Sequence, residues 1–430
     1  MTWGGYVVGK FQTAKQVSTA FKFPKDIFFE EGKLIMKKTL AAVAVLGAFA
    51  GSAIAADVTL YGRIDEGLLY QRVDADQPHQ SADNSWGLQS GNMTGSRFGI
   101  KGSEQISEDL KVSFTLEQGF NPDDGSFGDD DRMFNREASL RVTTAYGELG
   151  FGRMGRLLSD AGTYAQRGQF ILGSSWGGMT GGTELITDKT SSRLDNMITY
   201  KSPTFGGVTV YAQYAGGDTA KADSEEENTS KTDRYYGLVA VGQWGALSAM
   251  LGVEQTNYAS YFAETDNVWG EKDDGSWGVT EEGEAAHGED QDDSIGVEAS
   301  VAYDFGVVKT SLTGRYFKDA NDFNTIVDTE SIGKIDGYGI KVAAAAPVFG
   351  GNLQGMLGYM SAETSDTTLK NDKEVDRYTV AVTYDYPLSK RTKLYTAASY
   401  TKDDFKDNND SANDHKPNNT AFMFGMAHYF

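Results

Sequence analysis

Cysteine is absent from this 430-residue chain, proline occurs only 7 times, and the mean hydropathy is negative, at −0.43. The absence of cysteine excludes a disulfide framework and any cysteine-ligated metal site. The negative mean hydropathy excludes a bundle of membrane-spanning helices, because each such helix needs about 20 predominantly apolar residues. It is compatible with a membrane barrel, whose lumen and loops are polar.

Basic residues are also scarce: 39 lysines and arginines stand against 61 acidic residues, and the formal net charge is −22. This balance gives no indication of a nucleic-acid partner. A soluble chain of this length would usually divide into two or more domains. No stretch of the sequence is typical of a linker between domains, so one large all-β unit is the simpler expectation.

The segment 36–55 is predicted to be a secretory signal peptide. A methionine and two lysines at 36–38 precede an apolar run at 40–50 and the small-residue cleavage site Ala53-Ile54-Ala55. The apolar run is too short to cross a bilayer as a helix of the mature protein.

Residues 1–35 are interpreted as an upstream extension that is not part of the fold, with translation starting at Met36. An unusually long basic region before the signal is the alternative. We expect the mature chain to begin at Ala56 or Asp57, so that 56–430 forms the folded unit.

Beyond residue 56 helical periodicity is absent. Stretches of about ten residues with alternating polarity recur instead, as at 208–214, 297–303 and 394–400. Each stretch alone would also suit a soluble β-sandwich.

The connections between these stretches alternate between short and long. The seven short ones are at 107–109, 146–147, 203–206, 243–245, 304–306, 347–350 and 387–390. The eight long ones are near 74–92, 121–131, 155–190, 216–231, 259–291, 320–334, 362–373 and 403–417. Short turns at one end and long loops at the other, joining an even number of strands, are typical of transmembrane barrels. The sequence therefore predicts an all-β fold, a sixteen-stranded antiparallel transmembrane β-barrel.

The last residues strengthen this prediction. Phe422, Phe424, Met426, His428 and Phe430 stand at every second position. This spacing predicts a final strand with one largely aromatic face turned to lipid, ending at a membrane interface.

Several short motifs resemble those of one family. They are Asp57 to Gly62 (DVTLYG), Ser96 to Gly102 (SRFGIKG), Leu110 to Phe120 (LKVSFTLEQGF), Phe134 to Arg136 (FNR), Gly147 to Arg153 (GELGFGR) and Ser202 to Gly207 (SPTFGG). The sequence thereby resembles the general, non-specific porins of Gram-negative bacteria, especially their betaproteobacterial and neisserial branch. The resemblance is dense from 56 to about 215 and resumes at the C-terminus.

The resemblance implies a multi-pass outer-membrane protein that forms a homotrimer. Its function would be the passive diffusion of small hydrophilic solutes and ions through a pore, with a third loop folded into the lumen. The implied partners are outer-membrane lipid and lipopolysaccharide, and the barrel assembly machinery, which would read the terminal Phe430.

The resemblance also implies a constriction built from charged side chains. Four basic positions match family motifs, Glu117 matches an acid among them, and Asp160 matches an acid on the third loop. The basic positions are Arg63, Arg97, Arg136 and Arg193. Opposed basic and acidic walls set a transverse field that orients small polar solutes.

The third loop departs from the enterobacterial Pro-Glu-Phe-Gly-Gly pattern. Trp176, Gly177 and Gly178 keep the aromatic residue and the glycines, but the acid is missing. A second loop acid is replaced by Gln166, next to Arg167, which we expect to add to the basic side. The acidic wall is therefore thin, and we expect weak anion selectivity or near neutrality.

The strand that follows Arg136 raises a conflict. If Arg136 points into the lumen, strand alternation turns Glu137, Ser139 and Arg141 outward, where charges facing lipid cost several kcal/mol. Glu66 raises the same difficulty on the first strand. Either these early strands face another subunit, or the register is misjudged by a residue.

The long connections hold much of the acid. The segment 259–291 carries ten acidic residues against one lysine, and 121–131 carries five aspartates. Such runs are solvated. They serve either solubility alone or the binding of divalent cations that bridge lipopolysaccharide, and no other cofactor is expected.

An outer-membrane enzyme is the rival from another class. Catalysis would require a histidine-paired nucleophile or acid–base group. His79, His287 and His415 fall in expected outer loops and His428 on the expected lipid face, none in a motif with Ser or Asp. We expect no enzymatic activity.

A substrate-specific channel for sugars or anions stays open as an alternative. Tyr164, Phe170 and Trp176 on the third loop are the residues from which an aromatic ladder would start.

Overall fold

The computed structural model describes residues 57–430 with gaps. The gaps are 78–80, 129–131, 174–175, 177–179, 181, 189–191, 217–231, 259–260, 263–267, 272–275, 282–286, 289–291, 322, 324–325, 327–332 and 366–371. The expected extension 1–35 and signal peptide 36–55 lie outside the described residues. Within the described part of the chain, no helix has the length and apolar character needed to cross a membrane.

Almost all regular structure is β-strand. The strands of the main sheet are β1 (Thr59–Asp74), β2 (Asp83–Ser90), β3 (Arg97–Ser107), β4 (Leu110–Gly119), β5 (Glu137–Thr144), β6 (Gly147–Gly155), β7 (Arg193–Lys201), β8 (Val208–Gly216), β9 (Arg234–Trp244), β10 (Leu247–Asn257), β15 (Ser294–Asp304), β16 (Lys309–Asn321), β17 (Lys334–Val348), β18 (Gly351–Thr364), β19 (Lys373–Pro387), β20 (Thr392–Asp407) and β21 (Asn418–Tyr429). Two small ladders in the connection after β10 comprise β11 (Tyr261–Phe262), β12 (Val268–Glu271), β13 (Trp277–Glu281) and β14 (His287–Gly288). Short 3₁₀ helices are η1 (Arg167–Gln169), η2 (Thr183–Ile186) and η4 (Ser411–Asn413).

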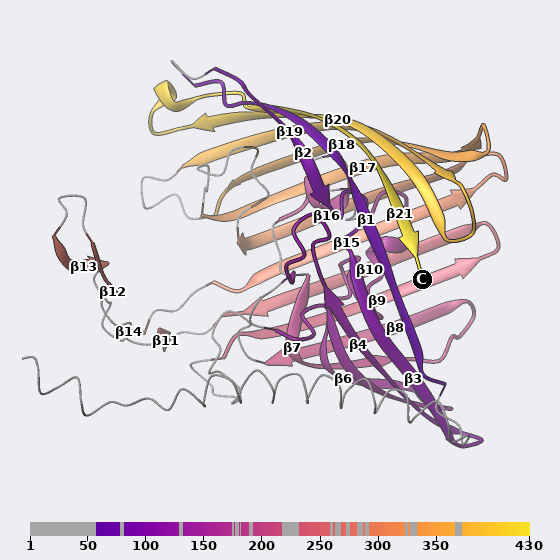
Figure 1. Ribbon diagram of the computed structural model, residues 1–430. Helices are drawn as coiled ribbons and strands as arrows, with labels where there is room; N and C mark the ends of the chain where they lie inside the picture. The colour runs from indigo at the N-terminus through magenta and orange to yellow at the C-terminus, as the bar shows by residue number, and fades with distance from the viewer. Residues whose placement is uncertain are drawn as a thin grey trace, which may run out of the picture. The chain divides into compact units, whose positions relative to one another are not determined.

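The main sheet closes on itself (Figure 1). Neighbouring strands pair antiparallel in chain order, and β21 returns to pair with β1 from Arg63↔Tyr429 to Asp74↔Asn418. Seventeen strands form the sheet, but β2 and β3 pair with successive parts of β1 and so share one position in the wall. The predicted sixteen-stranded antiparallel barrel is confirmed.

The alternation of short and long connections is as expected, but the predicted long connection at 74–92 is wrong in part, because it contains strand β2. The short turns join β3–β4, β5–β6, β7–β8, β9–β10, β15–β16, β17–β18 and β19–β20, and the long connections all lie at the other end of the strands. This segregation follows from the strand order, because successive antiparallel strands return the chain alternately to the two ends of the barrel.

The chain leaves the wall between β2 and β3. Glu66 of β1 pairs with Ser90 at the end of β2, and Arg63 of β1 pairs with Arg97 at the start of β3. The chain thus advances seven residues from Ser90 to Arg97 where β1 advances only three. The extra residues form a segment at 91–96, called here the lumen insertion. Its Met93 and Thr94 line an interior cavity, so the segment projects inward.

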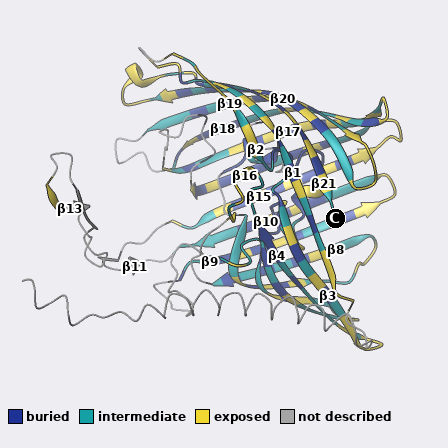
Figure 2. Ribbon diagram, viewed as in Figure 1, coloured by how far each residue is buried: buried dark blue, intermediate teal, exposed yellow. Residues whose placement is uncertain are grey.

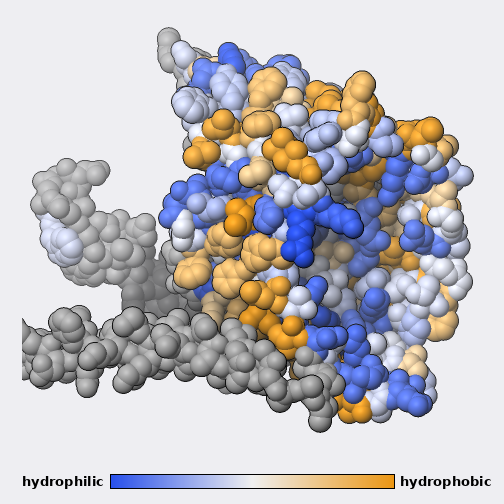
Figure 3. Space-filling view, turned by 45° about the vertical axis from the view of Figure 1, so that its right-hand side comes forward, coloured by the Kyte–Doolittle hydropathy of each residue, from blue (hydrophilic) through white to orange (hydrophobic). Residues whose placement is uncertain are grey.

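The outer surface of the wall is apolar. Buried and exposed residues alternate along the strands (Figure 2), and the exposed ones include Leu251, Val342, Leu357 and Phe424. On the face seen in Figure 3, hydrophobic patches lie beside hydrophilic ones.

Exposed aromatic residues follow both ends of the strands, as in the girdles of membrane barrels. Toward the long loops they are Tyr70, Trp86, Tyr236, Tyr316, Tyr338, Tyr378, Tyr400 and Phe422; toward the turns they are Tyr146, Tyr200, Phe205, Trp244, Tyr303, Phe305, Phe349 and Tyr386. The expected outward face of the final strand is confirmed, with Phe422, Phe424, Met426, His428 and Phe430 all exposed.

The predicted outward orientation of Glu137, Ser139 and Arg141 is wrong. All three point inward: Arg141 Nη1 lies 3.2 Å from Glu137 Oε1, and Ser139 Oγ donates to the same oxygen at 2.7 Å. Strand β5 begins one residue after Arg136, so the direction of Arg136 does not follow the alternation of the strand. Glu66 does face outward, opposite the exposed Met426.

Candidate functional site

The third long connection, residues 156–192, folds into the barrel and is held there by buried ion pairs. At its two ends, Arg156 Nη2 lies 2.9 Å from Glu254 Oε2, and Asp188 Oδ1 accepts from Arg315 Nε at 2.5 Å. Arg315 also donates to Glu254 Oε1 at 2.8 Å, so one network joins both ends of the loop to β10 and β16. Breaking one member of such a buried network leaves an uncompensated charge, which is strongly destabilising.

Arg167 belongs to this anchoring rather than to the expected basic cluster. It forms a bidentate pair with Glu298 on β15, with Nη2 2.6 Å from Oε2, and it is 5 % exposed. Its charge is therefore neutralised at β15, away from the arginines of β1 and β3. The expectation that Arg167 adds to the arginines of the constriction does not match this geometry.

The middle of the loop rests on β17. Lys341 Nζ donates to the carbonyl oxygens of Ile171 and Leu172 and to the hydroxyl of Thr183. Gly339 permits the close approach of η2, because a Cβ there would stand 1.8 Å from the carbonyl oxygen of Ile186. Any side chain at 339 would push the loop off the wall.

Glu184 lies on η2, outside the strands. Burial raises the pKa of its carboxyl well above the usual range, and the neighbouring Asp160 acts in the same direction. Burial therefore disfavours the charged form of this carboxyl.

The described part of the loop tip contacts the lumen insertion. The backbone N–H of Trp176 donates to the carbonyl oxygen of Met93 at 3.0 Å, and its ring stands edge-on to Tyr395 at 5.9 Å between centroids. Gly177 and Gly178, named with Trp176 from the sequence, lie outside the described residues.

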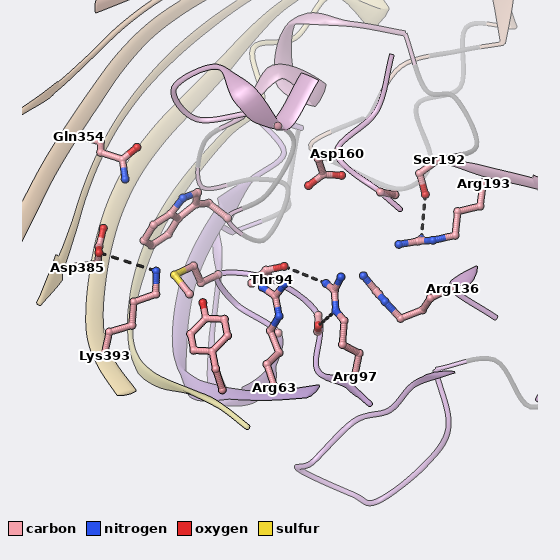
Figure 4. A pocket seen from close by; sticks show the side chains of 17 residues that line it. Arg63, Thr94, Arg97, Arg136, Asp160, Ser192, Arg193, Gln354, Asp385 and Lys393 are labelled. Atoms are coloured by element: carbon pink, nitrogen blue, oxygen red, sulfur yellow. Dashed lines mark hydrogen bonds and ion pairs between the residues drawn. The ribbon is translucent and has the colours of Figure 1, made fainter. Parts of the chain in front are cut away.

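A cavity of about 490 Å³ separates the third loop from the wall of β1, β3 and β20. Arg63, Arg97, Arg136 and Arg193 converge on it, and Asp160 lies across from them in Figure 4. The structure therefore brings together five of the six residues expected at the constriction. The sixth, Glu117, lies directly behind the arginines.

Glu117 is shared by two of the arginines. Its Oε1 accepts from Arg136 Nε at 2.8 Å and from Arg97 Nη1 at 3.4 Å, and its Oε2 accepts from Tyr61 Oη at 3.0 Å. Gly99 makes room for Tyr61, because a Cβ there would meet the Tyr61 hydroxyl at 2.8 Å. The glycine of the SRFG motif thus leaves room for the Tyr61 ring, whose hydroxyl donates to Glu117.

Arg63 and Arg193 complete the basic wall in other ways. Arg63 stands directly opposite Arg97 in the ladder and stacks on Tyr429, with its Cζ 5.3 Å from the ring centroid. Arg193 Nη1 donates to the Ser192 hydroxyl at 3.2 Å. Like charges directly opposite one another repel, so the pairing of Arg63 with Arg97 leaves a site that favours a negative solute.

Sequence reasoning missed several residues of the cavity. Lys393 lies 3.9 Å from Asp385, and both line the cavity together with Gln354, Thr94 and Tyr429. Strand alternation alone would have placed Lys393 and Tyr429 inside. Successive side chains of a strand point to opposite faces, and the neighbours of these two residues lie on the outward face. Nothing in the sequence marks Thr94, which belongs to the lumen insertion.

The balance of charge in the cavity is positive. Five basic side chains line it, against the acids Asp160 and Asp385, and Glu117 is already paired. In a narrow section with low-dielectric walls, charges this close act strongly on a passing ion. The arrangement suits the passage of small hydrated solutes, with a preference for negative charge. It contains no nucleophile paired with a histidine among the described lining residues.

No group of three or more His, Cys, Asp or Glu side chains within the described ranges is arranged to hold a metal ion. Much of the acidic connection at 259–291, where divalent cations were expected, lies outside those ranges.

Comparison with known proteins gives a consistent result. The family model described as Gram-negative porin matches residues 41–408. An outer membrane porin protein of Bordetella pertussis is 30% identical over 398 residues, covering 85% of this chain and 94% of the relative. The major outer membrane protein P.IB of Neisseria sicca is 27% identical over 206 residues, covering 47% of this chain and 54% of the relative. A solved structure, the anion-selective porin from Comamonas acidovorans, superposes with a TM-score of 0.55 at 22% identity, covering 87% of this chain and 100% of that one.

Proposed function

Because this chain belongs to the Gram-negative porin family, we propose that it forms a pore for the passive diffusion of small hydrophilic solutes and ions, and that the cavity facing the third loop is its constriction. The chain is an outer-membrane protein with transmembrane β-strands, and its relatives are porins, which are channels rather than enzymes. The observation that carries the proposal is the convergence of Arg63, Arg97, Arg136 and Arg193 on one cavity beside an inward-folded loop.

The pore is proposed to be weakly anion-selective. The formal net charge of −22 points the other way, but much of the acid lies in the long connections. Charges beyond about 8 Å are screened at physiological salt, whereas the five basic groups of the cavity act at close range. The Comamonas porin is described as anion-selective, but at 22% identity it shares the fold only, so the proposal rests on the charges of this chain.

A sugar-specific channel finds little support. Tyr164 and Phe170, two of the three aromatic residues that would start a ladder, are buried in a cluster with Met154, Leu157 and Met197. Only Trp176 of the three lines the cavity. Liposome swelling with sugars of graded size separates the two cases, because a general pore sorts solutes by size and a specific one saturates.

Single-channel recording in planar bilayers tests the proposal directly. We expect the wild-type reversal potential in a salt gradient to indicate a mild preference for chloride over potassium. Arg97→Gln and Arg136→Gln should each shift it toward potassium, because each removes a positive charge from the narrowest section. A strongly cation-selective wild type that neither substitution moves would place the constriction elsewhere.

Three further properties are proposed from family membership. They are assembly as a homotrimer, contact with lipopolysaccharide, and recognition of the terminal Phe430 by the barrel assembly machinery. A Vibrio cholerae outer-membrane protein of the same fold is described in a trimer form. In this chain, Gly62 seats Phe430, since a Cβ at 62 would meet the phenylalanine ring at 2.5 Å.

A further inference from the structure

We infer that Asp65 is a positioning residue for the constriction: by holding the lumen insertion, it fixes both the guanidinium of Arg97 and the tip of the third loop. This inference rests on the proposed function, because it assumes that the cavity is where solutes are selected. Asp65 itself does not line the cavity.

The carboxylate of Asp65 is fully buried and fully used. Its Oδ2 accepts from the backbone N–H groups of Thr94 at 2.8 Å and Met93 at 3.2 Å, and its Oδ1 accepts from Tyr395 Oη at 2.6 Å. Asp65 is 0 % exposed. An ionised carboxylate buried to this degree persists only when its oxygens are hydrogen-bonded, and here the lumen insertion supplies most of the donors.

The backbone of Asp65 holds the two ends of the same segment. Its carbonyl oxygen accepts from the N–H of Gly91 at 2.8 Å, and its N–H donates to the Ser96 hydroxyl at 2.9 Å. One residue of β1 thus closes a six-residue excursion, which replaces the ladder hydrogen bonds that the wall loses there.

The lumen insertion in turn holds Arg97. Arg97 Nε donates to the carbonyl oxygen of Gly95 at 3.0 Å, and its Nη2 donates to the Thr94 hydroxyl at 3.1 Å. Two of the guanidinium's hydrogen bonds are therefore to the lumen insertion, which Asp65 holds in position. If the insertion moved, Arg97 would keep only its longer contact to Glu117.

The insertion also holds the loop tip. Met93 accepts from Trp176 N–H, and the Trp176 backbone has φ of +84°, a conformation that costs energy in a non-glycine residue. Such a conformation persists only where the surroundings impose it, and the Met93 carbonyl and the Tyr395 ring are two contacts of Trp176 among the described residues.

These contacts form a closed circuit. Tyr395 bonds Asp65, Asp65 bonds Met93, Met93 bonds Trp176, and the Trp176 ring returns to Tyr395. Loss of one link loosens both the Arg97 guanidinium and the tip of the third loop, while the buried ion pairs of the loop remain. A carboxylate that merely stabilised the barrel would have no reason to set the selectivity.

The test uses Tyr395→Phe, which removes the hydroxyl but keeps the ring on Trp176, and Asp65→Asn, which removes the charge. In planar bilayers Tyr395→Phe, which leaves the number of charges unchanged, should shift the reversal potential toward potassium by less than Arg97→Gln does, and both Tyr395→Phe and Asp65→Asn should increase open-channel current noise. Tyr359→Phe is the control, because Tyr359 Oη donates to Asp376 Oδ1 at 2.7 Å in a less buried tyrosine–aspartate pair that does not line the cavity.

A second readout does not depend on ion current. The chain has no cysteine, so Asn92→Cys places a single thiol at a position that is 0 % exposed. Adding Tyr395→Phe should raise its labelling rate by a soluble thiol reagent about tenfold, the effect expected from losing one hydrogen bond to a charged acceptor. Adding Tyr359→Phe should leave the rate unchanged.

The outcomes separate the two proposals. If Arg97→Gln shifts the reversal potential while Tyr395→Phe does not, and labelling at 92 stays slow, the role of Asp65 is wrong and the proposed constriction stands. If Arg97→Gln has no effect either, the constriction itself is misplaced. Should Asp65→Asn fail to fold, Tyr395→Phe and the labelling experiment still decide.

Discussion

The basic residues of the barrel interior differ in how much of their charge is left for a passing solute. Arg63 has an aromatic ring beneath it and no carboxylate within ion-pair distance among the described residues. Arg97 and Arg136 share the single Glu117. Arg167 is wholly paired with Glu298. A count of arginines therefore says less about selectivity than the position of each acid.

Glu117→Gln should move the reversal potential toward chloride. The substitution releases Arg97 and Arg136 from their shared acid and keeps the volume of the side chain, so the net positive charge of the cavity rises. The measurement is a reversal potential in a potassium chloride gradient. Glu374→Gln, at an exposed pair with Lys406, removes the same charge far from the cavity and should have little effect. An equal response to both would mean that remote charge sets the selectivity.

Arg167→Gln should destabilise the barrel with little change in selectivity. Breaking a buried ion pair costs about 3–5 kcal/mol, and the buried Glu298 carboxylate would be left with the longer contact to Arg315, whose Nη1 lies 3.8 Å from Glu298 Oε2. The urea midpoint of the protein in detergent reports this loss. The double variant Arg167→Met with Glu298→Leu should recover much of it, since both charges are gone. A double variant as unstable as the single one would contradict the ion-pair account.

At the scale of elements, strands and turns were predictable and long-range anchors were not. Alternating polarity fixed the strands, and the period of two placed Arg97 inside with Phe98 outside, as observed. The same rule failed at Glu137, because Arg136 sits in the bend before β5 and reaches the cavity without following strand alternation. A one-residue error in a strand's start inverts every side chain in it.

The lumen insertion and the loop anchors escaped prediction for a different reason. Apart from Met93, residues 91–96 are small or polar, as in many loops, and nothing local shows that they turn inward. Arg167 and Glu298 are 131 residues apart in the chain, and the local sequence around either residue does not predict the ion pair between them. Nothing in the sequence distinguishes Asp65, whereas its neighbour Glu66 presents the evident problem of an outward charge.

Gly339→Ala should change conductance while leaving the barrel intact. The added methyl would collide with the Ile186 carbonyl and displace η2 from β17, moving the third loop within the lumen. Single-channel conductance and its variance are the measured quantities. Gly314→Ala is the control on the adjacent strand, where the nearest atom would be 3.9 Å away. Identical conductance in both variants would show that the loop does not rest on Gly339.

At the scale of the whole molecule, one outward charge remains to be explained. Glu137 and Arg141 turn inward and no longer argue for a subunit interface. Glu66 still lies on the outward side of β1, and its carboxylate oxygens are buried with no hydrogen-bond partner among the described residues. A charge facing lipid at mid-depth is costly, so this part of the wall suits contact with another subunit.

We therefore expect a heat-modifiable trimer that resists mild detergent. Native mass measurement and cross-linking should give three copies of the mature chain. On an electrophoresis gel, heating should convert the trimer band to a band of unfolded monomer. Glu66→Leu removes the unpaired charge and tests whether it lies at the contact, by a change in the temperature at which trimers dissociate. Only monomer under mild conditions would contradict the expectation.

The mature protein should begin at Ala56 or Asp57. The Ala53-Ile54-Ala55 site is the basis, and N-terminal sequencing of the protein isolated from outer membranes is the measurement. Finding residues that precede Met36 in that material would overturn both the cleavage site and the interpretation of 1–35.

The pairing of β1 with β21 has a consequence for how the protein is made. It joins Arg63 to Tyr429, residues separated by almost the whole of the barrel sequence. Contacts so distant in the chain form slowly, and before they form both edge strands expose unpaired backbone groups that lipid cannot satisfy. Truncation within β21 should therefore abolish the barrel outright rather than weaken it in proportion to the residues removed. The barrel is closed only when the last strand pairs with the first.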